Sequence, residues 1–321
     1  MVPSLAWAVV QGPDVTLGGS GGAGPRTIFQ IGSVTKVFTA LLLADMAERG
    51  EVRLSDPAAR YLPGATGPVT LADLATHTSG FPRLPRGLFW FALLSPRDPY
   101  ARYPERRFLR VARRALHTGS GVHPYSYSNF GYGLLGHLLA QAAGTPYPTL
   151  VTTRICGPLG LADTTFEVPA PSRDRKARGH LRGRPVPDWH LGPLPAAGAL
   201  YSTATDLATF LQTHLTAASP APTTPLTPDS PPAPGALLAS LASAIRATLV
   251  PRHPVPGGEI GLAWHQIRRG DHTIIWHNGM TGGFSSMVAF DPARSLGVAA
   301  LANTAGKLPS PLDEAVLRAL S

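Results

Sequence analysis

Cysteine is almost absent from this sequence, since Cys156 is the single thiol among 321 residues. A lone cysteine excludes an internal disulfide and any metal site that needs several cysteine ligands. Cys156 lies in the apolar stretch RICGPLGL. We therefore interpret it as a small core residue and not as a nucleophile.

Long apolar runs are also missing, and none approaches the ~18 residues that a membrane-spanning helix needs. The N-terminus has no basic region, and LAWAVV is too short for the core of a signal peptide. If Met1 is the natural start, we expect a cytoplasmic protein; if a signal sequence has been removed, we expect a periplasmic or secreted one. The glycine-rich segment 18–24 lacks a following Lys-Ser/Thr, so it is interpreted as a flexible loop and not as a phosphate loop.

Acidic residues are scarce, because 19 Asp and Glu stand against 28 Lys and Arg, for a formal net charge of +9. Such an excess indicates either an anionic partner or a compositional bias. We favour the bias, because the basic residues are mostly dispersed. The amphipathic segment 104–117 carries a stripe of arginines, which we interpret as a solvated face. Clustered basic residues with interleaved aromatics are not evident, so we predict no nucleic-acid partner.

The two ends of the chain have the pattern of β-structure, and the middle is mainly helical. Strands are expected at 4–10, 15–17, 261–267, 273–277, 285–291 and 297–303. The longer helices are expected after Ser33 and at 104–117, 129–143, 201–215, 236–248 and 310–320. Residues 219–234 hold seven prolines, which is typical of an extended or mobile insertion. We predict one domain, in which 1–55 and about 255–321 form an α/β part and about 56–250 a mainly helical part.

Ser33 and Lys36 are the first candidates for chemistry. Positions i and i+3 share one face of a helix, so the hydroxyl and the amine are predicted to be neighbours at a helix start. A serine needs an adjacent base to become a nucleophile. Lys36 can be that base if burial or a nearby cation lowers its pKa toward ~7–8.

Two further segments carry candidate residues. Tyr127 can relay a proton if a cation lowers its pKa, and Asn129 can orient a substrate amide or the lysine. Gly279 lies on an expected strand, where the missing side chain lets a substrate backbone come close.

These segments together resemble one superfamily. FQIGSVTK at 29–36, YSN at 127–129 and HNG at 277–279 are similar, in this order, to the three motifs of class C β-lactamases, DD-peptidases and the related serine esterases of family VIII. The segments LATHTSGFP, PLGLADTTF and NGMTGGFSS add weaker matches, and the resemblance covers nearly the whole chain. It implies an α+β fold: an antiparallel sheet from the N- and C-terminal strands, flanked by helices, with a mainly helical region inserted and the site at their junction.

The resemblance also implies roles for individual residues. Ser33 would be the nucleophile, with Lys36 and Tyr127 handling the proton and Asn129 orienting. His277 and Gly279 would line the substrate strand, and the backbone N–H groups of Ser33 and Met280 would form the oxyanion hole.

His277 stands where typical β-lactamases have lysine, and histidine is mostly neutral at pH 7. Because esterase-like and D-aminopeptidase-like relatives share this histidine, the departure weakens the interpretation as a β-lactamase. Small carboxylic esters are the first expectation for the substrate, followed by β-lactams and D-amino-acid peptides or amides.

The leading hypothesis is accordingly a serine acyl hydrolase with a covalent acyl-enzyme, no cofactor and no metal. A non-catalytic, penicillin-recognising homologue is the alternative that the intact set Ser33, Lys36 and Tyr127 argues against. The aromatic stretch Phe89–Phe91 is equally consistent with an acyl or alcohol pocket and with core. The sequence does not predict an oligomeric state.

Overall fold

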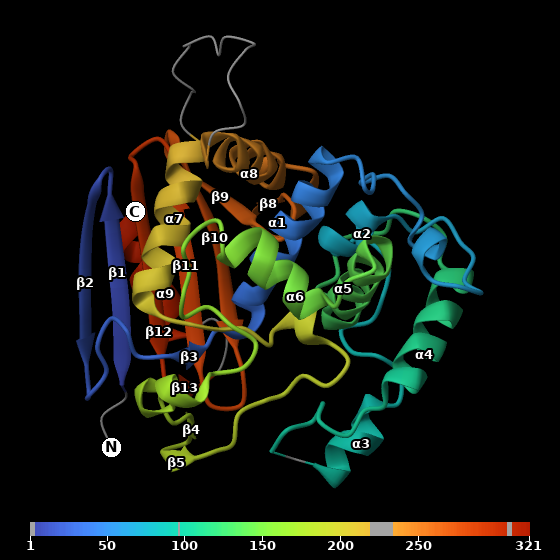
Figure 1. The fold of residues 1–321 in the computed structure, drawn as a ribbon, viewed down its shortest axis with the longest axis horizontal. Helices are drawn as coiled ribbons and strands as arrows, with labels where there is room; N and C mark the ends of the chain where they lie inside the picture. Colours follow the sequence, from blue (N-terminus) through green and yellow to red (C-terminus); the bar gives the residue numbers. More distant parts are fainter. Residues whose placement is uncertain (1–3, 96, 219–233, 307–309) are drawn as a thin grey trace.

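An eight-stranded antiparallel sheet forms one half of the molecule (Figure 1). The structure is a computed structural model, and it describes residues 4–95, 97–218, 234–306 and 310–321. The strand order is β2-β1-β12-β11-β10-β9-β8-β7, so the first two strands of the chain join the last ones. Their bounds are β1 Leu5–Gln11, β2 Asp14–Ser20, β7 His253–Val255, β8 Gly258–Ile260, β9 His265–Arg269, β10 His272–Met280, β11 Ser285–Asp291 and β12 Leu296–Ala302. The predicted α+β fold, with a sheet built from both ends of the chain, is confirmed.

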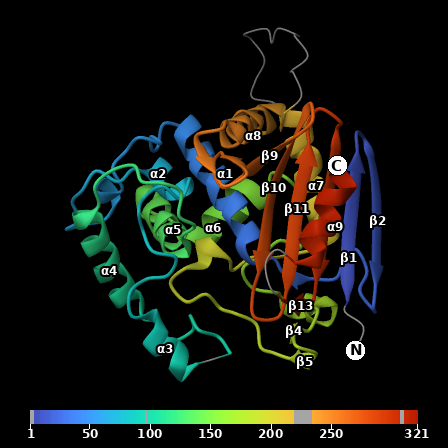
Figure 2. The same ribbon diagram turned by 180° about the vertical axis from the view of Figure 1, so that it is seen from behind.

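Helices cover both faces of this sheet. Helix α9 (Pro311–Leu320) lies on one face, against β11 and β12 (Figure 2). The other face is covered by α7 (Ala204–Ala218), with α8 (Pro234–Leu249) and α1 (Thr35–Glu48) beside it (Figure 1). Strands β11 and β12 are therefore buried along their whole length, which explains their nearly continuous apolar sequences.

The remaining elements lie mostly in the inserted region beside the sheet (Figure 1). Its longer helices are α4 and α5, and α5 begins and ends where the sequence predicts. The bounds are α2 Leu71–Ala75, α3 Leu88–Leu94, α4 Glu105–Thr118, α5 Asn129–Ala143, α6 Tyr147–Val151, and the short strands β3 Phe29–Gln30, β4 His180–Leu181, β5 Arg184–Pro185, β6 Tyr201–Ser202 and β13 Thr304–Ala305.

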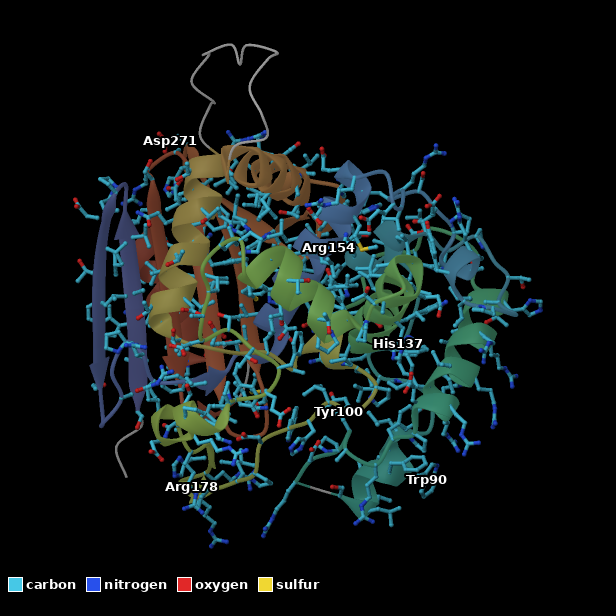
Figure 3. All side chains as sticks on the ribbon, viewed as in Figure 1. Trp90, Tyr100, His137, Arg154, Arg178 and Asp271 are labelled. Carbon is cyan, nitrogen blue, oxygen red and sulfur yellow. The ribbon has the colours of Figure 1, made fainter. Side chains whose placement is uncertain are left out.

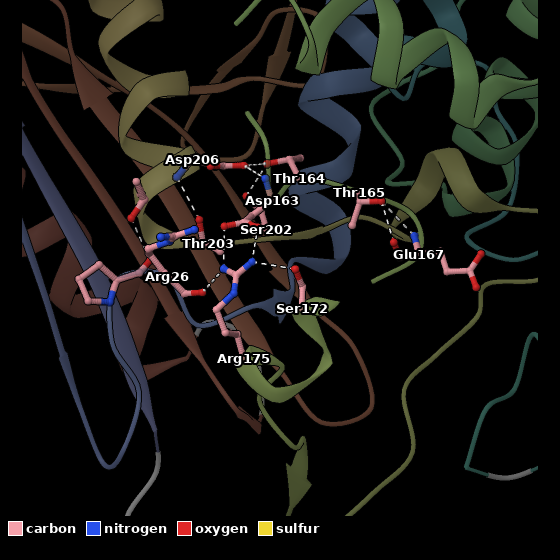
Figure 4. Close-up of polar contacts among 12 residues, drawn as sticks. Arg26, Asp163, Thr164, Thr165, Glu167, Ser172, Arg175, Ser202, Thr203 and Asp206 are labelled. Atoms are coloured by element: carbon pink, nitrogen blue, oxygen red, sulfur yellow. Dashed lines mark hydrogen bonds and ion pairs between the residues drawn. The ribbon is translucent and has the colours of Figure 1, made fainter. Parts of the chain in front are cut away.

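Polar side chains tie the inserted region to α7. The Asp206 carboxylate on α7 accepts hydrogen bonds from the Thr164 hydroxyl (2.8 Å) and the Asp163 backbone N–H (2.9 Å). The Arg175 guanidinium in turn donates to the Asp163 carboxylate at 2.7 Å (Figure 4). Because such partly buried charges need partners, this network fixes the loop that follows α6.

Three sequence predictions are wrong in detail. Strand β2 continues to Ser20, through the start of the predicted flexible loop; Gly18 faces the Trp7 ring, and a Cβ there would lie 2.2 Å from it. Residues 201–202 form a strand, and α7 starts at Ala204 with Thr203 accepting a hydrogen bond from the Asp206 N–H. Residues 261–264 are not a strand, because the Gly261 turn closes against the Thr248 carbonyl. The proline-rich prediction at 219–234 lies outside the described residues, apart from the backbone of Pro234 at the start of α8.

A buried histidine makes stability depend on pH. His214 on α7 is fully buried among Phe210, Trp264 and Phe290, and burial lowers its pKa to about 4. In the unfolded chain His214 takes up a proton near pH 6.5, whereas in the folded protein it stays neutral until about pH 4. Protonation therefore favours the unfolded chain below pH 6.5, and the free energy of unfolding falls as the pH is lowered from 6.5 toward 4. His214→Leu should therefore reduce the loss of stability between pH 7 and pH 4.5 by about 2–3 kcal/mol.

Denaturant titrations at the two pH values measure this difference, and a pH-independent packing loss cancels from it. His117→Leu, at an exposed position, is the matched control and should leave the difference unchanged. An equal pH dependence in wild type and His214→Leu would contradict the prediction.

Candidate active site

Ser33 lies in a tight turn that leads directly into α1. The 3₁₀ helix Gly32–Val34 precedes the helix, and Gly32 has φ +49°, in the left-handed region that favours glycine. A Cβ on Gly32 would lie 2.7 Å from the backbone nitrogen of Met280 on β10. The glycine thus lets the turn that carries Ser33 press against the strand.

Lys36 reaches back over one turn to Ser33. Its Nζ lies 2.9 Å from Ser33 Oγ and 2.9 Å from Asn129 Oδ1, and it donates to the Ala197 carbonyl at 2.6 Å. These partners are neutral, and the lysine side chain is fully buried. Burial, and secondly the charge of Arg83, hold the pKa of Lys36 well below its usual value. A neutral amine beside the hydroxyl is the arrangement that a general base requires.

Tyr127 lies next to both groups. Lys36 Nζ is 4.9 Å from the centroid of its ring, and the Arg83 guanidinium carbon is 5.0 Å from it. Burial raises the pKa of Tyr127, although the Ser33 hydroxyl and the charge of Arg83 oppose that effect. The cation-lowered pKa considered from the sequence is therefore not found, and this phenol is protonated at neutral pH. It is placed to donate a proton.

Asn129 is the first residue of α5, and its amide bridges the two walls of the site. Its Oδ1 accepts from Lys36, and its Nδ2 lies 3.5 Å from the Tyr100 hydroxyl. The Ser128 hydroxyl caps the helix by accepting from the Gly131 N–H at 2.9 Å. A helix start fixed in this way holds the amide toward the lysine.

Strand β10 forms the other side of the site. A Cβ on Gly279 would lie 2.1 Å from the Ile31 carbonyl and 3.0 Å from the Ser33 backbone nitrogen. The Ser286 hydroxyl donates to the same Ile31 carbonyl at 2.7 Å. Residues 279 and 280 of β10 therefore pack against the turn that carries Ser33, and the oxyanion role of the Ser33 and Met280 N–H groups stays a prediction.

Gly279→Ala should separate this strand from the Ser33 turn. A methyl group cannot fit 2.1 Å from a backbone oxygen, so β10 must move and carry the Met280 N–H with it. Loss of one oxyanion donor typically costs about 10²–10³ in kcat, and we expect a loss of that size with a lowered Tm. Gly24→Ala is the control, since a Cβ there meets nothing within 4 Å. If Gly279→Ala kept the kcat and Tm of the wild type, β10 would not lie as close to the Ser33 turn as the structure shows.

His277 does not contribute to the lining of the cleft. Its ring is buried, with Nδ1 2.7 Å from the Asn278 carbonyl, the His265 ring 5.6 Å away and the Tyr127 ring 6.5 Å away. Burial, followed by the charges of His265 and Lys36, keeps the pKa of His277 well below its usual value. On this strand, Trp276, Asn278, Gly279 and Met280 contribute to the lining of the cleft. The role of His277 toward substrate stays a prediction.

An open cleft of about 810 Å³ lies over Ser33. Aromatic and cationic residues that sequence reasoning did not single out contribute to its walls: Arg83, Tyr100, Tyr125, Trp189, His265, Arg269 and Trp276. Figure 3 labels Tyr100 in the region between the sheet and the helical part. Tyr125 lies two residues before Tyr127, so the YSYSN segment held a signal for it, whereas no local pattern marks Arg83 or Trp189.

The aromatic stretch Phe89–Phe91 does not line the cleft. Phe91 packs against the core, whereas Phe89 and Trp90 are each 67% exposed. Among the described residues, no group of three or more His, Cys, Asp or Glu could hold a metal ion. Likewise, no described helix is long and apolar enough to cross a membrane.

Comparisons with known proteins agree on one family. The family model described as Beta-lactamase matches residues 1–321. The chain is 29% identical over 286 residues to the D-alanyl-D-alanine-carboxypeptidase/endopeptidase AmpH of Escherichia coli K12, covering 84% of this chain and 69% of that protein. It is 29% identical over 315 residues to a beta-lactamase of Pseudomonas fluorescens, covering 87% and 80%. The crystal structure of a class C beta lactamase from Rhodobacter sphaeroides superposes with a TM-score of 0.80 at 24% identity, covering 100% of this chain and 95% of that one.

Proposed function

Because this chain belongs to the β-lactamase family and is a serine hydrolase, we propose that it transfers an acyl group to Ser33 and then to water, with small carboxylic esters as its preferred substrates. The observation that carries the proposal is the buried amine of Lys36, 2.9 Å from Ser33 Oγ, with its pKa lowered by burial. An ordinary surface lysine would be protonated and could not accept the proton of the serine.

The steps follow from these positions. Ser33 Oγ bonds to the ester carbonyl carbon while its proton passes to Lys36 Nζ. The N–H groups of Ser33 and Met280 bind the oxygen that becomes negative. The C–O bond to the alcohol then breaks, the alkoxide takes the Tyr127 proton, and the Lys36 ammonium reprotonates the phenolate. A water molecule repeats the attack on the acyl-enzyme and releases the carboxylic acid, which regenerates Ser33.

Labelling with a serine-reactive fluorophosphonate tests this role directly. The reagent should attach to one peptide, the one that contains Ser33, and prior incubation with a nitrophenyl ester should slow the labelling. Label on another serine, or no label on active enzyme, would remove Ser33 from the mechanism.

The preference for esters rests on the charge of the third motif. His277 is buried and its pKa is lowered, so this position offers no fixed positive charge to a substrate carboxylate. Aromatic residues such as Tyr100 and Trp276 line the cleft and suit an uncharged acyl or alcohol group.

A second candidate substrate class is favoured by two other residues. Arg83 and Arg269 line the cleft, and neither has an ion pair in the part of the chain that the structure describes. A guanidinium suits the carboxylate of a β-lactam or a D-peptide. Comparing kcat/KM for a nitrophenyl ester, a chromogenic cephalosporin and a D-alanyl peptide separates the two. Preference for the cephalosporin or peptide, with a raised KM in Arg269→Gln, would reverse the ranking.

Arg83 should also set the pH at which the enzyme becomes active. Lys36 can act as the base only in its neutral form, so kcat/KM should rise as the pH increases through the Lys36 pKa. Burial is the main cause that lowers that pKa, and the charge of Arg83 lowers it further. Arg83→Gln removes the repulsion, so the acidic limb of the profile should move to higher pH.

The profile is measured with a neutral ester, which does not titrate itself. Arg269→Gln is the matched control, because Arg269 lines the same cleft but is not among the charges that act on Lys36. Coincident limbs in wild type and Arg83→Gln would contradict this electrostatic role.

A further inference from the structure

Helix α3 (Leu88–Leu94) is apolar on both of its faces. Its inner side packs in the ordinary way: Leu88 is buried, and the Phe91 ring lies 5.4 Å from that of Tyr103. Its outer side is also apolar, although it faces solvent: Phe89, Trp90, Leu93 and Leu94 are 67%, 67%, 58% and 64% exposed. A surface helix normally carries polar residues there.

These four side chains form one continuous patch. Positions 89, 90, 93 and 94 are one turn apart in pairs, so they share a side of the helix. The Phe89 and Trp90 rings touch edge to face at 5.6 Å. Figure 3 shows Trp90 at the outer rim of the molecule, away from the sheet. Exposed apolar residues gathered on one surface mark an interaction site.

The surroundings of the patch are strongly basic. Residues 83–114 contain nine arginines against two acids, a net formal charge of +7, where the whole chain carries +9. The basic residues are therefore less dispersed than the composition suggests. Of the two acids, Asp98 faces His190 at 2.9 Å and Glu105 faces His137 at 3.7 Å.

Four of these arginines surround a groove beside Trp90. The groove has a volume of about 870 Å³ and lies between the 79–87 loop and α4 (Glu105–Thr118). Its cationic lining is Arg86, Arg107, Arg110 and Arg114. In the described chain these guanidinium groups have no carboxylate partner, and the groove contains no acidic residue. The arginine stripe of α4 therefore lies next to the exposed Trp90.

We propose that α3 and this arginine groove dock the protein on the surface of a bilayer that contains anionic lipids. The apolar side chains would enter the boundary between headgroups and acyl chains, while the arginines bind lipid phosphates. A nucleic acid would match the charge but not Leu93 and Leu94, and a second copy of this chain would place the two arginine clusters face to face. The 79–87 loop borders both this groove and the catalytic cleft, through Arg86 and Arg83 respectively, so docking brings the cleft near the membrane.

Co-sedimentation with vesicles tests the proposal on the full chain. We expect binding to phosphatidylcholine vesicles that contain phosphatidylglycerol, little binding to pure phosphatidylcholine, and weakening by salt. Arg110→Gln with Arg114→Gln should weaken partitioning roughly 10- to 30-fold. Phe89→Ser with Trp90→Ser should weaken it by at least about tenfold. Both variants should keep wild-type Tm and wild-type turnover of a soluble ester, since these residues lie outside the cleft.

A matched charge control is Arg268→Gln with Arg318→Gln, which removes two exposed arginines from β9 and α9, away from α3 (Figure 1). It should bind vesicles like the wild type. No binding to anionic vesicles, equal binding to neutral ones, or equal loss in the control would overturn the proposal. If the protein self-associates and Phe89→Ser with Trp90→Ser abolishes this, the patch binds a second copy of the chain and the proposal is wrong. Tighter binding to a DNA duplex than to vesicles would instead indicate a nucleic acid.

Discussion

Replacing Ser33 by alanine is expected to reduce acyl transfer by at least about 10³-fold while the protein stays folded. The serine hydroxyl lies 2.9 Å from Lys36 Nζ, and an alanine at this position has no oxygen that could attack the substrate. The Gly32–Val34 turn is held by its backbone against Met280, so removing one oxygen does not disturb it. Steady-state turnover of a nitrophenyl ester, beside a thermal melt, measures both expectations.

Ser172→Ala is the matched control for Ser33→Ala. It removes a hydroxyl that bonds Arg175, far from the cleft, and should keep full activity. If Ser33→Ala retained more than a few per cent of wild-type turnover, another group would have to be the nucleophile. The fluorophosphonate-labelled peptide would then identify it.

The parts of the site that a sequence can predict are those fixed by local geometry. The i, i+3 spacing of Ser33 and Lys36 places their side chains together on any helical turn, and the structure has them so. Helix α5 starts at Asn129, as predicted, and the Ser128 hydroxyl caps its first turn. Thr70 and Asp73, three residues apart, form a capping box at the start of α2 by the same kind of local geometry.

Contacts between distant segments were beyond such reasoning. The Ala197 carbonyl bonds Lys36 across 161 positions of sequence, and a backbone oxygen leaves no signal in residue types. The charge of Arg83 acts on Lys36 because an irregular loop places the two residues near each other. The periodicity of a sequence does not predict the course of such a loop. Phe89 and Trp90 show the opposite failure, since their hydrophobicity suggested a pocket or core and the fold leaves them in solvent.

The reactivity of Lys36 depends on burial more than on any one neighbour. A charged amine surrounded by a hydroxyl, an amide oxygen and a carbonyl lacks the anion that would repay its lost hydration. Burial therefore favours the neutral form of Lys36, and it also holds the pKa of the nearby His77 and His277 well below the usual value. In the proposed mechanism, Lys36 accepts the serine proton without the help of a carboxylate.

Lys36 and Tyr127 are accordingly expected to work as one unit. Lys36→Met, which keeps the length of the side chain, should lower kcat/KM by about 10²–10⁴-fold, and Tyr127→Phe by at least about 10². In the proposed mechanism both groups handle the same proton beside Ser33, and the amine lies 4.9 Å from the ring centroid. Once one is missing, removing the other should cost little more, so the double variant should resemble the worse single variant.

The double-mutant cycle is read from kcat/KM for one neutral ester at a pH above the acidic limb. Lys176→Met is the control for the loss of an ammonium, because Lys176 pairs with Asp188 outside the cleft and should not affect turnover. Melting temperatures exclude unfolding as the cause, since Lys36→Met leaves the Asn129 and Ala197 oxygens without their donor. Losses that multiply fully in the double variant would mean that Lys36 and Tyr127 move different protons, and the route from Ser33 through the amine to the phenol would be wrong.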